Sequence, residues 1–153
     1  MERLNLIKQK EKNTVYSRAT AEKVLENILK RINEVNTNKE FIYKITKAVV
    51  FGSYINSNKE KLGDLDIALY IKLKDSTKSE YMQNYTQSKK SNKYVPFLLE
   101  SIYGKEEVFK FIKNRKRVLQ LHDGVKAEAD AKYHNEPKCY IYVDEYNIIY
   151  EEK

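Results

Sequence analysis

The chain reads Val49-Val50-Phe51-Gly52-Ser53 and, after a polar connection, Gly63-Asp64-Leu65-Asp66-Ile67-Ala68-Leu69. The first stretch predicts a buried strand over 47–51 that ends at the glycine. The second predicts a strand over 64–73, in which the period of two places the apolar side chains on one face and both aspartates on the other. A glycine directly after a buried strand lets the backbone turn sharply and come close to a ligand.

The residues around these strand ends have the chemistry of a phosphate and metal site. A serine hydroxyl at Ser53 and free backbone N–H groups at the start of a helix form a cradle for phosphate oxygens. Asp64 lies eleven positions after Ser53, and Asp66 lies two positions further on. Two carboxylates on one face of a strand suit Mg²⁺ or Mn²⁺. This arrangement is what attack on the α-phosphate of a nucleoside triphosphate requires, because the metal stabilises charge on the phosphoryl oxygens.

These two stretches and the connection between them resemble the Gly-Ser…Asp-x-Asp signature of the polymerase-beta-like nucleotidyltransferase superfamily. The minimal nucleotidyltransferases are the members of similar size. The resemblance implies that Gly52 and Ser53 bind the triphosphate and that Asp64 and Asp66 hold the divalent metal. Tyr54, next to the turn, is a further candidate for contact with the nucleotide. The expected fold is α+β, with a small mixed sheet flanked by helices.

The third carboxylate of that family normally lies on a later strand, between apolar neighbours. The best-placed strand here is 118–123, and its inward position holds Gln120. A neutral amide brings no charge and is a poor general base. Asp123 or Asp144 could supply the third carboxylate if the register differs, whereas His122 is expected to be structural or exposed.

The remaining pattern predicts a single nucleotidyltransferase-like domain over 1–153, with residues 1–15 as a loose arm. An amphipathic helix is expected from an N-cap at Thr20 to a stop at 36–38. A later helix is expected to end near Gly104, and the end of the chain is expected to form a hairpin around 145–147.

Composition limits the classes of function. The 153 residues carry 29 Lys and Arg against 22 Asp and Glu, a net charge of +7, which favours polyanions such as nucleotides and nucleic acid. The run Lys113-Asn114-Arg115-Lys116-Arg117 could contact phosphates, or it could simply complement a helix dipole. No apolar run is long enough for a membrane span, and the charged start predicts a cytoplasmic protein without a secretory signal. One cysteine and two histidines leave a Cys/His zinc site short of ligands.

The sequence therefore predicts a Mg²⁺-dependent enzyme that transfers a nucleoside monophosphate from an NTP to a hydroxyl of a small molecule, a protein or an RNA end. Resemblance to the minimal nucleotidyltransferases implies that a homodimer or a separately encoded helical partner of HEPN type completes the site. Gln120 and the basic surface keep a second interpretation open. It is a catalytically degenerate module of the same fold that binds nucleotide, RNA or a partner protein.

Overall fold

The computed structural model describes residues 15–134 and 145–153, and its centre is a four-stranded sheet in the order β5–β4–β2–β6. Strand β2 pairs antiparallel with β4 and β6, whereas β4 and β5 run parallel. The sheet is therefore mixed, and the predicted α+β class is confirmed. The strands are β2 (Tyr43–Phe51), β4 (Leu65–Leu73), β5 (Leu119–Asp123) and β6 (Tyr146–Glu151).

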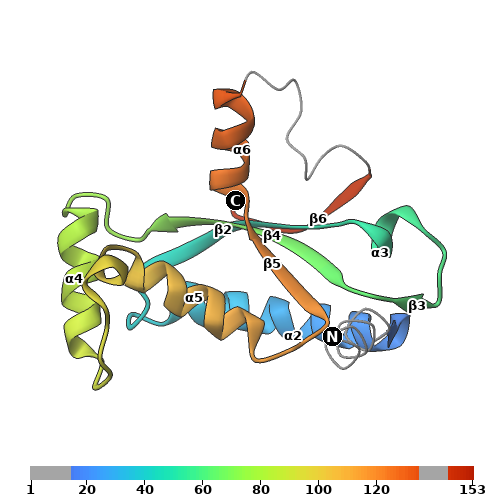
Figure 1. Cartoon of the computed structure of the whole chain (residues 1–153), viewed down its shortest axis with the longest axis horizontal. Coiled ribbons are helices and arrows are strands. Elements are labelled where there is room, and N and C mark those ends of the chain that lie inside the picture. Colours follow the sequence, from blue (N-terminus) through green and yellow to red (C-terminus); the bar gives the residue numbers. More distant parts are fainter. Residues whose placement is uncertain (1–14, 135–144) are drawn as a thin grey trace, which may run out of the picture.

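Helices cover both faces of this sheet (Figure 1). Helices α2 and α5 lie on one face, and α6 stands on the other. A short pair, β1 with β3, and the single turn α3 lie at one end, and α4 with the 3-10 helix η1 lies at the opposite end. Their bounds are β1 (Tyr16–Ser17), α2 (Arg18–Thr37), α3 (Ser53–Asn56), β3 (Lys61–Leu62), α4 (Glu80–Lys90), η1 (Phe97–Ile102), α5 (Tyr103–Lys113) and α6 (Gly124–Tyr133).

Alternation along β4 explains the two layers. Leu65 and Ile67 belong to one buried cluster with the apolar stripe of α2, as the sequence predicts. On the opposite face Ala68 is buried in a smaller cluster with Ala127 and Ala131 of α6, a helix that the sequence analysis did not assign. Since helices cover both faces of the sheet, a polar functional site is expected at the ends of the strands.

Several boundaries differ from those expected. The N-cap of α2 is Ser17 rather than Thr20, because the Ser17 hydroxyl accepts a hydrogen bond from the Thr20 backbone N–H at 3.1 Å. Strand β2 begins at Tyr43 rather than at residue 47. Residues 1–14, most of the expected arm, lie outside the described residues.

Gly104 does not end a helix. It lies in the first turn of α5, where a Cβ atom would meet the Ile42 side chain at 2.6 Å, so close packing explains the glycine. The residues before it form the 3-10 helix, with Phe97 and Leu98 exposed.

The prediction of a hairpin turn around 145–147 is also wrong, because Tyr146 and Asn147 lie in strand β6. The other arm of that hairpin falls in 135–144, outside the described residues.

A buried polar network ties α4 to the start of α5. The Asn84 amide donates to the Tyr43 hydroxyl at 2.7 Å, and the Asn84 carbonyl oxygen accepts from the Gly104 backbone N–H at 2.8 Å. The Tyr43 hydroxyl donates in turn to Glu80 at 2.8 Å. Burial raises the pKa of Tyr43, which keeps this hydroxyl protonated and able to donate.

We expect Asn84→Ala to lower the free energy of unfolding by about 2–4 kcal/mol, because it leaves the Gly104 N–H unpaired and opens a cavity. Asn33→Ala, an exposed change on α2, is the control and should change stability by less than about 0.5 kcal/mol. Urea unfolding followed by circular dichroism measures both. Equal midpoints for the two variants would contradict the network's role.

Candidate nucleotide and metal site

The turn at the end of β2 depends on Gly52. Its backbone has φ 79° and ψ −154°, a conformation open to glycine and strained for other residues. Its carbonyl oxygen accepts from the backbone N–H groups of Ile55 and Asn56 at 3.1 and 2.9 Å, which starts α3. A Cβ atom at Gly52 would lie 2.6 Å from Oδ2 of Asp66. The absence of a side chain thus lets this carboxylate approach the turn.

Strand register brings the predicted pieces together. Phe51 pairs with Asp66 across β2 and β4, and Asp66 pairs with Gln120 across β4 and β5. Partners in register share a face of the sheet, so these three side chains are neighbours on adjacent strands. Asp64 is exposed one residue before β4 begins. The Gly-Ser turn, the Asp pair and Gln120 therefore meet at one end of the sheet.

His122 also contacts Asp66, a relation that sequence reasoning missed. Its Nε2 lies 3.1 Å from Oδ1 of Asp66, and its ring centroid lies 5.1 Å from that of Phe51. The side chains of His122 and Asp66 are 29% and 26% exposed. The alternation from Gln120 to His122 was visible in the sequence, but the parallel pairing that sets His122 beside Asp66 was not.

Of the two candidates for a third carboxylate, Asp123 does not reach this point. Asp123 pairs in register with Leu69, on the other face of the sheet, and its carboxylate caps α6 by accepting from the Lys126 backbone N–H at 3.0 Å. Asp144 lies outside the described residues. Over 15–134 and 145–153, no three His, Cys, Asp or Glu side chains gather in a group able to hold a metal ion.

Ser53 and Tyr54 open α3 on different sides. Ser53 is exposed at the first position of the helix. The Tyr54 ring is half-buried against the core, with the Arg18 guanidinium 4.8 Å from its centroid. Of these two side chains, that of Ser53 is thus the one exposed to solvent.

Arg18 holds the connection between the turn and the Asp pair. Its guanidinium donates to the carbonyl oxygens of Tyr54, Ser57 and Lys59 at 2.8, 2.8 and 3.0 Å. The Arg18 backbone N–H donates to the backbone carbonyl oxygen of Glu60 at 2.9 Å, next to the pairing of β1 with β3. One side chain near the start of α2 therefore orders the residues that separate Ser53 from Asp64.

Arg18→Ala should speed amide hydrogen exchange over 54–61 and lower the free energy of unfolding by about 1–3 kcal/mol, since three carbonyl groups lose their donor. Lys23→Ala, an exposed change on the same helix, should leave exchange in this segment as it is in the unchanged protein. Exchange measured by mass spectrometry tests the prediction, and unchanged protection in Arg18→Ala would refute it.

The basic run lies at the same end of the sheet. Helix α5 ends at Lys113, and the next two residues take positive φ values of 47° and 58°. Arg115, Lys116 and Arg117 are exposed directly before β5. The Leu65 backbone N–H donates to Val118 at 2.7 Å, which sets this run beside the start of β4 and hence beside Asp64. Of this run, only Lys113 lies in the last turn of α5, so the helix dipole does not account for the other three cations.

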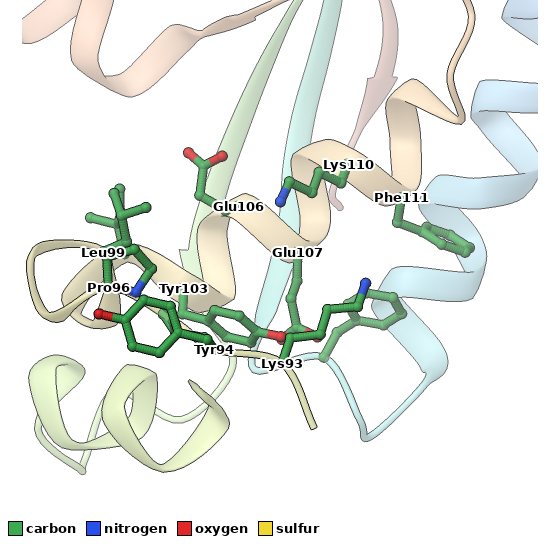
Figure 2. A pocket seen from close by; sticks show the side chains of 12 residues that line it. Lys93, Tyr94, Pro96, Leu99, Tyr103, Glu106, Glu107, Lys110 and Phe111 are labelled. Carbon is green, nitrogen blue, oxygen red and sulfur yellow. The ribbon is translucent and has the colours of Figure 1, made fainter. Parts of the chain in front are cut away.

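A cavity of about 590 Å³ opens elsewhere, between α5 and the segment before η1 (Figure 2). Tyr94 and Leu99 lie at one end of it, and Phe111 lies at the other. None of its lining residues belongs to the Gly-Ser turn, the Asp pair or β5. The candidate site is therefore a surface at the strand ends rather than this cavity.

The oxygen donors present suit an ion that takes part of its coordination shell from elsewhere. Asp66 points its carboxylate toward the glycine turn, and Asp64 is exposed nearby in the chain. Mg²⁺ commonly binds through one or two carboxylates and fills its other positions with water and substrate phosphates. The residues therefore fit a metal that arrives with a nucleotide.

Comparison of the chain with models of protein families, with curated proteins and with solved structures found no match. No helix within the described ranges is long and apolar enough to cross a membrane.

Proposed function

We propose that this protein is a metal-dependent nucleotidyltransferase with the polymerase-beta-like fold. The observation that carries the proposal is the close approach of Asp66 to the Gly52 turn, at the point where Ser53 opens α3. The resemblance implies the order helix, strand, helix, strand, and the chain has α2, β2, α3 and β4 in that order, with the short strand β3 between α3 and β4. A phosphate cradle and a metal-binding carboxylate on adjacent strands are the two parts that this reaction needs.

In the proposed reaction the oxygen of an acceptor hydroxyl attacks the α-phosphorus of an NTP. The bond from that phosphorus to the bridging oxygen breaks, pyrophosphate leaves with the electron pair, and the proton of the acceptor hydroxyl passes to water. Gly52 and Ser53 would bind the triphosphate through backbone N–H groups and the serine hydroxyl. Asp64 and Asp66 would hold Mg²⁺ or Mn²⁺, which neutralises charge on the phosphoryl oxygens. The acceptor remains a small molecule, a protein or an RNA end, and the homodimer or HEPN-type partner remains a proposal.

Calorimetric titration of ATP, GTP, CTP and UTP, with Mg²⁺ and with EDTA, tests the nucleotide site. We expect binding that needs the metal and is lost in the double variant Asp64→Asn/Asp66→Asn. Asp130→Asn, an exposed change on α6, should bind as the unchanged protein does. Metal-independent binding that survives in the double variant would refute the assignment of the Asp pair.

A degenerate module of the same fold is the second candidate. Two observations favour it: Gln120 occupies the position in register with Asp66, and three exposed cations precede β5, which pairs with the strand that follows Asp64. This candidate predicts that nucleotide or RNA binds with a steep salt dependence and that no pyrophosphate is released. Measuring pyrophosphate release with each NTP therefore separates the two functions.

A further inference from the structure

The contact between His122 and Asp66 joins strands that are far apart in sequence. His122 lies two residues beyond Gln120 on β5 and is in register with Ala68. Its Nε2 nevertheless lies 3.1 Å from Oδ1 of Asp66, and the Phe51 ring packs beside it. The imidazole is thus held between an aromatic ring and the carboxylate to which we assign the metal.

The distance between these two atoms is that of neighbouring ligands on one ion. Bonds of about 2.1 Å at right angles place two ligand atoms about 3.0 Å apart. Without a metal, a hydrogen on one of the two atoms explains the same separation. With a metal, the ion takes the place of that hydrogen, and the nitrogen lone pair faces the ion.

The other polar residues of β5 do not compete for this position. Gln120 is exposed, and Asp123 is engaged as the cap of α6. His122 is partly exposed, so a hydrated ion can reach it. On β5, the side chain that lies within hydrogen-bond distance of Asp66 is that of His122.

We infer that His122 is a nitrogen ligand of the proposed metal beside Asp66, with water and substrate phosphates filling the other positions of the ion. The inference rests on the proposed function, since it assumes that Asp66 binds the ion. A neutral nitrogen in place of a charged oxygen weakens the site for Mg²⁺ and favours first-row transition ions. The protein should therefore bind Mn²⁺ at least about tenfold more tightly than Mg²⁺.

Pulsed electron paramagnetic resonance of bound Mn²⁺ tests the ligand directly, because a coordinated imidazole modulates the signal through its ¹⁴N nucleus. The probe is Mn²⁺ with inorganic tripolyphosphate, which supplies phosphates and contains no nitrogen, added to the full chain without an affinity tag. We expect ¹⁴N modulation in the unchanged protein and in His134→Gln, the matched control for an exposed histidine. His122→Gln should lose the modulation and bind Mn²⁺ about tenfold more weakly.

A second variant keeps the test decisive. His122→Asp restores a carboxylate, so it should lack the modulation while its preference for Mn²⁺ over Mg²⁺ falls about tenfold. Mn²⁺ that binds in an Asp66-dependent way without ¹⁴N modulation would overturn the role of His122 and leave the proposed function standing. Mn²⁺ binding that Asp66→Asn does not weaken would overturn both. Thermal unfolding of each variant shows whether it is folded.

Discussion

Asp66→Asn should reduce metal-dependent transfer of a nucleoside monophosphate by about 10³-fold or more. The substitution keeps the size of the side chain but removes the charge that holds the ion, and a metal contributes several kcal/mol to the stabilisation of such a transition state. Asp66 pairs with Phe51 on one side and Gln120 on the other, so the backbone of the site should stay as it is. The assay follows the α-phosphate of a labelled NTP into product.

Stability separates a chemical effect from a folding effect in this variant. The Asp66 side chain is partly exposed, so we expect the free energy of unfolding to change by less than about 1 kcal/mol. Asp130→Asn, on the surface of α6, should keep both transfer and stability. Transfer at an unreduced rate in a folded Asp66→Asn protein would end the nucleotidyltransferase proposal.

Gly52→Ala should have the second-largest effect, because it acts on the backbone and on the carboxylate together. The values of φ and ψ at this turn cost a residue with a Cβ about 1–3 kcal/mol. The added carbon would also lie 2.6 Å from Oδ2 of Asp66 and displace it. Misplacing a metal ligand by about 1 Å lowers a rate on the order of 100-fold.

The chain offers a matched glycine as the control. Gly63 also lies beside the Asp pair, but a Cβ atom there would meet nothing within 4 Å. Gly63→Ala should therefore change urea stability and transfer little, whereas Gly52→Ala should lower both. Equal stability and equal transfer rates in the two variants would show that the close approach of Asp66 to Gly52 does not matter for function.

The local patterns predicted much of the fold. The period of two over 64–73 predicted a strand with one apolar face, and β4 with its buried Leu65 and Ile67 confirms this, whereas Asp64 lies one residue before the strand. The spacing of apolar residues after Thr20 gave the stripe of α2. Such features depend on residues a few positions apart, so the sequence displays them directly.

The ends of several helices and the existence of α6 depend on tertiary contacts that no local sequence pattern reveals. Gly104 resembles a helix stop, but it lies within the first turn of α5 because Ile42 packs against it. Helix α6 is rich in Ala and short of large apolar side chains, so its stripe was weak in the sequence. It is buried because Ala127 and Ala131 cover the second face of the sheet.

The local sequence predicts which chemical groups are available: a Gly-Ser turn after one strand and two aspartates at the start of the next. The side chains that surround Asp66 follow from the tertiary structure instead. The register of β4 with β5 joins Asp66 to His122 across 56 positions and diverts Asp123 to the cap of α6. Register follows from the burial of whole faces and from the connection that returns the chain to the sheet. Those are properties of the assembled layers, and no single stretch of the chain encodes them.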